Sequence, residues 1–164
     1  MSNERTMITF GRNNKRFNLR TAGIAIDDNY VLLHTAEKDD FWSFPGGRIE
    51  LGETSSDTLV REIKEELNAE VKIVRLLWFV ENFFVYDREN YHEICFYYLM
   101  QFKQRSPYLN KERSFRGVED DADLEFKWFP VDSEALGKLP LYPSFLQQSL
   151  TNLPTSVEHL VWRE

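Results

Sequence analysis

Three glutamates, Glu62, Glu65 and Glu66, are the residues of this sequence whose types and spacing point most directly to chemistry. Residues three and four apart on a helix lie on one flank, so these carboxylates would be neighbours. At an effective dielectric near 20, two carboxylates about 6 Å apart repel by roughly 3 kcal/mol, and a partly buried cluster therefore favours protonation or a bound cation. Carboxylate oxygens suit Mg²⁺, with Mn²⁺ as a substitute, and Mg²⁺ commonly bridges protein carboxylates to substrate phosphates. The spacing thus predicts a metal site for a phosphate-bearing substrate; a solvated acidic helix face is the alternative.

A helix that begins near Ser55 and ends before Asn68 is predicted to position these glutamates. Thr54 and Asp57 have the spacing of a capping box, in which the Thr54 side chain accepts from the backbone N–H of Asp57. Asn68 follows the last apolar residue, where a residue in the left-handed conformation commonly ends a helix. The apolar residues recur at helical spacing and should form one buried stripe: Leu59, Val60, Ile63 and Leu67.

The segment before this helix supplies further candidate residues. Pro45-Gly46-Gly47 should interrupt regular structure and let the backbone approach a ligand closely. Arg61 precedes Glu65 by one helical turn, so we expect it to orient that carboxylate through an ion pair. A surface salt bridge of little consequence is the alternative for Arg61.

The order of these residues resembles a known motif. From Gly47 the pattern is Gly, five residues, Glu53, seven residues, then Arg61-Glu62-Ile63-Lys64-Glu65-Glu66-Leu67-Asn68-Ala69. It resembles the Nudix box of the Nudix (MutT-like) hydrolases, here at residues 47–69. Asn68 stands where the family has Gly, and Ala69 where it has a larger aliphatic residue. Both departures lie at the helix exit, after the acidic residues, so they affect local geometry more than chemistry.

The resemblance implies an α/β fold, namely an α/β/α sandwich with a mixed β-sheet and the Nudix loop-helix. It also implies a metal-dependent hydrolase in which water attacks phosphorus at the pyrophosphate linkage of a nucleoside diphosphate joined to another moiety. By the same resemblance, the Gly46 carbonyl joins Glu62, Glu65 and Glu66 as a metal ligand. The implied catalytic set is Glu53, Arg61, Glu62, Glu65 and Glu66, in which either Glu53 or Glu62 is the general base.

The residues that would bind the substrate are less sharply indicated. Arg20 and Arg48 could contact phosphate, and Phe44 and Tyr86 could stack on a base. Tyr86 lies seventeen residues past the box, a spacing that resembles the diadenosine polyphosphate hydrolase subgroup. Most of the 24 aromatic residues should nevertheless belong to the core. Sugar nucleotides, nucleoside triphosphates and dinucleoside polyphosphates all stay open as substrates, and the alternative function is a catalytically silent Nudix-fold sensor of nucleotides or nucleotide sugars.

Composition limits the remaining choices. The 164 residues, 42% of them apolar, fit one domain over residues 1–164. No run approaches 18 apolar residues, and Met1 to Arg5 lacks the apolar core of a signal peptide, so we expect a cytoplasmic protein without a membrane partner. The net charge of -7 argues against broad nucleic-acid binding. We expect a small nucleoside diphosphate derivative as the partner, and a homodimer stays open. Cys95, the only cysteine, is interpreted as a packed thiol.

Strand-like segments surround the predicted helix and indicate a layered α/β or α+β protein. Glu93, on a predicted strand, is a candidate extra metal ligand or base, with an ion pair as the alternative. The charged segment Gln104 to Asp123 is predicted to be a mobile loop over the site, where Glu119, Asp120 and Asp121 would add a ligand or simply be solvated. The predicted strands are Met7–Phe10, Phe17–Ile26, Tyr30–Thr35, Phe41–Phe44, Val71–Tyr86, Tyr91–Phe102, Leu124–Val131 and His159–Arg163, with helical segments at Ser133–Leu136 and Ser144–Leu150.

Overall fold

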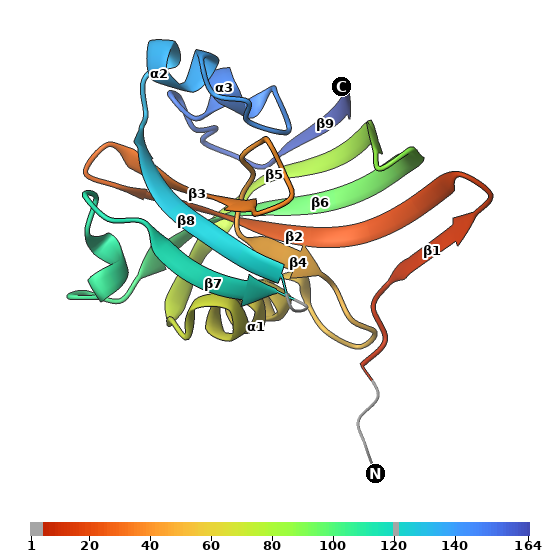
Figure 1. Ribbon diagram of the computed structural model, residues 1–164, viewed down its shortest axis with the longest axis horizontal. Helices are drawn as coiled ribbons and strands as arrows, with labels where there is room; N and C mark the ends of the chain where they lie inside the picture. Colours follow the sequence, from red (N-terminus) through yellow and green to blue (C-terminus); the bar gives the residue numbers. More distant parts are fainter. Residues whose placement is uncertain (1–4, 120–121) are drawn as a thin grey trace.

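The chain is built on a mixed β-sheet with helices on both of its faces (Figure 1). The computed structural model describes residues 5–119 and 122–164. Helix α1 (Ser55–Leu67) covers one face, and the short helices α2 (Ser133–Gly137) and α3 (Leu146–Ser149) cover the other. The strands are β1 (Thr9–Arg12), β2 (Lys15–Asp27), β3 (Tyr30–Ala36), β4 (Gly46–Arg48), β5 (Val71–Tyr86), β6 (Glu89–Phe102), β7 (Phe115–Glu119), β8 (Ala122–Pro130) and β9 (Glu158–Arg163). The expected α/β/α sandwich with a mixed sheet is confirmed.

The strand β2 changes partner along its length. The sheet order is β7-β8-β3-β2-β6-β5-β9, in which β2 and β6 are parallel and β5 and β6 are antiparallel. The first half of β2 also pairs with β1 and β4, whereas only Ile26 and Asp27 pair with β3. As a result β4 lies beside the middle of β2 and feeds directly into the loop before α1.

Two tight hairpins connect long strands, as the sequence predicted. Asp28 and Asn29 have φ of 48° and 63°, and Asp87 and Arg88 have φ of 47° and 65°. Two consecutive left-handed residues match the right-handed twist of the strands that a hairpin joins. Because the second turn needs only two residues, β6 begins at Glu89, two residues earlier than expected.

Two apolar layers fill the sandwich. Leu59 and Ile63 of α1 pack in one layer, and Leu136 and Leu146 pack with Trp78 in the other. Cys95 lies fully inside the second layer, where burial raises the pKa of its thiol. Its interpretation as a packed thiol is confirmed. None of the helices in residues 5–119 and 122–164 is long and apolar enough to cross a membrane.

Three strand predictions need correction. Phe41–Phe44 forms only isolated bridges, His34 to Ser43 and Trp42 to Leu141. The apolar character that suggested a strand instead reflects packing, because Phe44 belongs to the core and Trp42 packs against it. A strand does form directly after this segment: β4, which begins at Gly46, inside the Pro45-Gly46-Gly47 sequence that was predicted to interrupt regular structure. At its start, a Cβ on Gly46 would lie 2.1 Å from the Thr21 carbonyl oxygen, so only glycine permits this close pairing with β2. The first strand is β1, shifted two residues from Met7–Phe10.

The segment 104–123 is more regular than predicted. It contains a short 3₁₀ helix, η1 (Pro107–Leu109), and the edge strand β7, which pairs antiparallel with β8. Hydrogen bonding to β8 compensates for the low apolar content that suggested a loop. Asp120, Asp121 and the side chain of Glu119 lie outside the described residues, so their role as ligands stays a prediction.

Candidate active site

Helix α1 has the ends that its sequence predicts. The Thr54 side chain accepts from the Asp57 N–H at 3.1 Å, and its hydroxyl donates to the Asp57 carboxylate at 2.7 Å. Asn68 ends the helix in the left-handed conformation, at φ 52° and ψ 32°. These two caps fix which residues of the segment are helical, and they thereby set the direction of every side chain on it.

The buried stripe of α1 differs from the predicted one at one position. Leu59, Ile63 and Leu67 are buried, but Val60 is 39% exposed. Glu66 lies beside the stripe instead and is only 5% exposed. The reason is helical geometry, because residue 66 follows residues 59 and 63 by seven and three positions, whereas residue 60 lies about 100° around the helix from residue 59. One of the three glutamates is therefore largely removed from solvent.

A glycine in β4 makes room for Glu62. A Cβ on Gly47 would lie 2.3 to 2.6 Å from three atoms of the Glu62 carboxyl group. The carboxyl group therefore packs directly on the backbone of β4, and any side chain at position 47 would displace it. Close contact with Glu62 of the helix therefore explains why position 47, the first residue of the motif, is a glycine.

Arg61 connects the loop before α1 to the helix itself. Its Nε lies 2.8 Å from Glu53 Oε1 and its Nη2 lies 3.0 Å from Glu53 Oε2, a two-pronged ion pair. Its Nη1 donates to Glu62 at 2.8 Å and to Glu65 at 3.1 Å. The predicted pair with Glu65 is present, but Glu53 is the principal partner. The Thr58 hydroxyl also donates to Glu53, at 2.7 Å.

This arrangement changes the protonation of the two partners. The hydrogen bonds from Arg61, together with that from Thr58, lower the pKa of Glu53 from 4.5 to about 2. The same contact with Glu53 raises the pKa of Arg61 above its already high value. Glu53 therefore stays ionised at any pH at which the protein would act, and both of its oxygens are engaged.

Two further residues complete the network, and the sequence did not single them out. Glu50 Oε1 lies 3.5 Å from Arg61, and Arg5 lies 2.6 Å from Glu65 and 3.9 Å from Glu50. Glu50 could have been noticed as a second acid in the loop, three residues before Glu53. Nothing in the sequence indicated Arg5, because only the path of the folded chain before β1 brings it close to Glu50 and Glu65.

A cavity of about 330 Å³ opens beside this network. Three helical carboxylates line it, those of Glu62, Glu65 and Glu66, and so do Arg20 and Arg48. Arg20 and Arg48 are directly opposite each other on β2 and β4, so they enter the cavity from the sheet. The other lining residues are Arg5, Met7, Glu50, Arg61 and Val118. Carboxylates on the helix and guanidinium groups on the sheet thus share one space.

Four of the predicted site residues do not line this cavity: Glu53, which is held by Arg61 and Thr58, and Phe44, Tyr86 and Gly46. Phe44 is buried in the core, edge-to-face with Tyr97. Tyr86 donates its hydroxyl to Asp39 at 2.9 Å and packs against Phe41. Neither ring belongs to the described residues that line the cavity. Gly46 lies immediately before Gly47 in β4, at the edge of the site but outside its lining.

Glu93 is better described by its alternative interpretation. It is 7% exposed, on the same face of β6 as Cys95, and its Oε2 lies 3.9 Å from Arg20 Nε. Burial raises the pKa of this carboxyl group, and the charge of Arg20 opposes that effect. Glu93 therefore forms an ion pair with Arg20, which lines the cavity, and Glu93 itself is not among the described residues that line it.

The donor set fits a divalent cation in its chemistry and in its shared cavity, but not in the present positions of the side chains. Carboxylate oxygens are the ligands that Mg²⁺ prefers, and three carboxylates line one cavity. In the present rotamers, however, no three His, Cys, Asp or Glu side chains of the described residues are gathered closely enough to hold an ion. Arg61 bonds to both Glu62 and Glu65. A cation would therefore have to compete with this guanidinium group for the two carboxylates.

Comparison with known proteins decides the family. The model of the NUDIX domain matches residues 17–148, most of the chain. The chain belongs to the Nudix family. The match begins within β2 and includes β4 and α1, and thus the glycines, the loop and the helix that build the site.

Relatives of this Nudix chain carry several names. The "RNA pyrophosphohydrolase" of Ruthia magnifica is 26% identical over 138 residues, which cover 76% of this chain and 77% of that protein. The mouse "Diphosphoinositol polyphosphate phosphohydrolase 2" is 28% identical over 130 residues, covering 78% of this chain and 73% of that one. A Mycobacterium tuberculosis protein named MutT4 is 39% identical over 93 residues, 55% of this chain, and this chain spans only 33% of its length.

Solved structures agree on the fold. The MutT protein from Bacillus halodurans has a TM-score of 0.60 at 20% identity, with 89% of each chain covered. A structure titled as a UDP-X diphosphatase has a TM-score of 0.58 at 18% identity, covering 87% of this chain and 66% of that one. At these identities the likeness concerns the fold alone, and the Nudix fold is the α/β/α sandwich described above.

Proposed function

We propose that this Nudix protein is a metal-dependent pyrophosphohydrolase that cleaves the pyrophosphate linkage of a nucleoside diphosphate joined to another moiety. One observation carries the proposal: a single cavity is lined by three helical carboxylates and by two arginines from the sheet. A diphosphate repels nucleophiles until its charge is neutralised, and a site that presents both a cation-binding wall and a cationic wall meets that need.

The residues divide into two groups by the charge they carry. Glu62, Glu65 and Glu66, with the Gly46 carbonyl, would hold Mg²⁺ or Mn²⁺, which neutralises phosphate charge and lowers the pKa of bound water. Arg20 and Arg48 bind the phosphate oxygens from the sheet side and fix the orientation of the linkage. The buried Glu93 holds Arg20 in position.

The general base must accept a proton from the attacking water. Glu53 is poorly suited, because Arg61 and Thr58 engage both of its oxygens and its pKa is about 2. Glu62 lines the cavity, and Arg61 donates to its Oε1 at 2.8 Å, whereas Arg61 and Thr58 together engage both oxygens of Glu53, so Glu62 is the better candidate. In the proposed step the oxygen of a water molecule bonds to phosphorus while the water gives a proton to Glu62. The bond from that phosphorus to the bridging oxygen breaks, and the bridging oxygen leaves with the second phosphate group. Glu53 then serves as the anchor that holds Arg61.

A substrate panel with product identification tests the proposal. Glu65→Gln and Glu66→Gln keep the side-chain shape and remove the charge, so each variant should stay folded without metal. We expect each to lose roughly 100-fold in turnover, the loss caused by removing one electrostatic contact to a transition state. Glu70→Gln is the matched control, because Glu70 lies just past the helix and pairs with Lys103 away from the cavity. Turnover at the parent rate in both test variants would remove the metal assignment.

A silent sensor of nucleotides is the second candidate, and one observation favours it. Arg61 already occupies the carboxylates of Glu62 and Glu65, and no ready three-carboxylate cluster exists among the described residues. Tight binding of diphosphates without turnover across the panel would support the sensor. Detectable metal-dependent turnover would support the enzyme.

The substrate and the state of the protein in the cell belong to the proposal as well. The panel includes sugar nucleotides, nucleoside triphosphates and dinucleoside polyphosphates, and the names of the relatives add RNA and diphosphoinositol polyphosphates. The single domain over residues 1–164, the cytoplasmic location and the homodimer stay predictions. Sedimentation at several protein concentrations would test the homodimer.

A further inference from the structure

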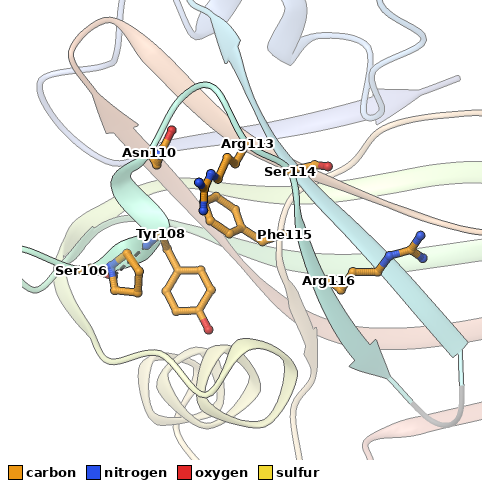
Figure 2. Close-up of a pocket in the computed structure, with 8 residues that line it drawn as sticks. Ser106, Tyr108, Asn110, Arg113, Ser114, Phe115 and Arg116 are labelled. Carbon is orange, nitrogen blue, oxygen red and sulfur yellow. Dashed lines mark hydrogen bonds between the residues drawn. The ribbon is translucent and has the colours of Figure 1, made fainter.

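A second, larger cavity lies on the segment between β6 and β8. It has a volume of about 650 Å³ and is lined by residues of η1, of β7 and of the loop between them (Figure 2). Pockets of about 300 to 1,000 Å³ are the usual size for small-molecule ligands. Among the described residues, no residue lines both this cavity and the acidic one. We call it the η1–β7 cavity, and its lining residues are Ser106, Pro107, Tyr108, Asn110, Arg113, Ser114, Phe115 and Arg116.

The charge of this segment is opposite to that of the protein. Residues 103–116 contain five basic residues and one acidic residue, a net charge of +4 in a protein of net charge -7. Lys103 pairs with Glu70, and Lys111 pairs with Asp27. Arg113 and Arg116 line the cavity, and no ion pair joins either of them to a carboxylate of the described residues. Unpaired guanidinium groups on an acidic protein favour an anionic ligand.

Two aromatic rings form part of the cavity wall. Tyr108 and Phe115 pack with ring centroids 5.1 Å apart at an angle of 66°, and both are half-buried. The Tyr108 hydroxyl donates to the Leu67 carbonyl at the end of α1, and Trp128 Nε1 donates to the Tyr108 carbonyl at 2.7 Å. These contacts attach the wall to α1 and to β8, so the rings are held in place before any ligand arrives.

The position of the arginines tells which one a ligand would meet. Arg116 follows Phe115 in β7, so the two side chains point to opposite faces of the strand, and in Figure 2 Arg116 extends away from the other labelled side chains. Arg113 lies two residues before Phe115, and both line the cavity. A ligand that contacts the rings therefore meets Arg113 first. Ser114, next to Arg113, adds a hydroxyl to the lining.

We propose that the η1–β7 cavity binds a small anion that joins a planar ring to a phosphate, of the nucleoside monophosphate class, at a site separate from the acidic cavity. Arg113 pairs with the phosphate, and the planar ring packs against Phe115 and Tyr108. Guanidinium groups bind phosphate with two parallel hydrogen bonds, and aromatic faces bind bases through stacking. This site goes beyond the proposed hydrolase activity and does not depend on it.

Titration calorimetry with AMP, in excess chelator, tests the proposal. AMP carries a base and a phosphate but has no diphosphate linkage, and the chelator removes metal from the acidic cavity. We expect Arg113→Glu to weaken AMP binding by roughly tenfold or more. Arg12→Glu, the same charge reversal at an exposed arginine of β1, should change it less than about twofold. Ribose 5-phosphate, which lacks the base, should bind at least about fivefold more weakly than AMP.

Three results would overturn the proposal. The first is no saturable AMP binding to the folded parent protein. The second is equal binding in the parent and in Arg113→Glu. The third is binding that survives Arg113→Glu but disappears in Arg48→Ala, since this would place AMP in the acidic cavity. None of them bears on metal-dependent turnover, which is measured separately with Glu65→Gln, so failure of this site and failure of the proposed function can be told apart.

Discussion

Arg61 and Glu53 form the contact on which the site is built at the scale of single residues. Arg61 is partly buried, and it binds carboxylates from the loop and from its own helix. Partly buried, two-pronged pairs of this kind are stronger than exposed ones. The sequence predicted only the exposed partner, Glu65, because helical spacing is visible in the sequence and the fold of the loop is not.

The first prediction concerns the stability that Glu53 provides. A carboxylate with a lower pKa in the folded than in the unfolded protein stabilises the fold above its unfolded pKa, and this stabilisation is lost as the pH falls through the folded pKa. For Glu53 the pKa is 4.5 in the unfolded chain and about 2 in the folded protein. We expect Glu53→Gln to lower the free energy of unfolding by about 1 to 3 kcal/mol at neutral pH. Denaturant melts in chelator measure this difference.

The pH dependence supplies the control for that experiment. Between about pH 4.5 and pH 2 the parent should lose the advantage, so that the two melting curves converge. A difference that stays constant down to pH 2 would mean that the ion pair with Arg61 is not its source.

The second prediction concerns His34, a buried histidine of β3. Its ring packs against Phe126, and Nδ1 has no hydrogen-bond partner among the described residues. Burial, with a smaller contribution from the charge of Arg20, lowers its pKa from 6.5 to about 3. Between pH 6.5 and pH 3, His34 is therefore protonated in the unfolded chain but neutral in the folded protein. The folded state loses stability as the pH falls from 6.5 towards 3.

His34→Leu, which is similar in volume, removes this proton uptake. Between pH 6.5 and pH 5 the parent should lose up to about 2 kcal/mol more than the variant, as measured by denaturant melts. If both proteins lose the same amount in this interval, His34 is already charged or exposed in the folded protein.

At the scale of elements, the exit of α1 is fixed by one residue. Asn68 has φ 52°, and its N–H donates to the Lys64 carbonyl at 2.9 Å. Asn tolerates the left-handed conformation better than most residues, but glycine has no Cβ penalty there. We expect Asn68→Gly to be neutral or to stabilise the protein by up to about 1 kcal/mol in denaturant melts.

A β-branched residue at the same position gives the opposite test. Asn68→Val should destabilise the protein by about 1 to 3 kcal/mol, because a branched Cβ is strained at positive φ. A clear loss of stability in Asn68→Gly would show that the Asn68 side chain contributes something beyond its backbone conformation. A neutral Asn68→Gly together with a destabilised Asn68→Val would show that the departure of this chain from the family's glycine costs little stability.

Elements with strong local signals could be predicted from the sequence, and elements made by pairing could not. The capping residues and Asn68 gave both ends of α1, and the Asp-Asn turn gave the first hairpin. In contrast, β4 has three residues and two glycines, and β7 is an edge strand in a charged segment. Their strand structure comes from hydrogen bonding to the neighbouring strands β2 and β8, and the local sequence of β4 and β7 does not reveal that these strands lie beside them.

The same distinction applies to the site. Spacing on one helix placed Glu62, Glu65 and Glu66 together, and the structure keeps them in one cavity. Arg20 and Arg48 were chosen for charge alone, and it is cross-strand register that brings them in. Phe44 and Tyr86 were proposed to stack on a base because they are aromatic. In this aromatic-rich chain, however, Phe44 packs against Tyr97 and Tyr86 packs against Phe41.

At the scale of the whole molecule, the acidic cavity exists only in the folded chain. Its lining comes from the segment before β1, from β2, β4 and the loop after it, and from α1 and β7, and it spans the sequence from Arg5 to Val118. Any ligand that needs several of these groups must bind the folded state in preference to the unfolded one. Binding and folding are therefore linked, and the link can be measured without a substrate.

The last prediction is that Mg²⁺ or Mn²⁺ stabilises the protein in the absence of substrate. A free metal concentration 100-fold above the dissociation constant would add about 2.7 kcal/mol to the free energy of unfolding, and chelator should reverse the gain. Glu65→Gln and Glu66→Gln should gain less, since fewer anionic oxygens hold the ion, whereas Glu70→Gln should gain as much as the parent. Melting curves with chelator and with millimolar metal measure all four proteins. Equal gains in every variant would place the cation elsewhere. No gain in any of them would mean that the ion cannot displace Arg61 from the carboxylates until a diphosphate is bound, and repeating the melts with a non-hydrolysable diphosphate would test that directly.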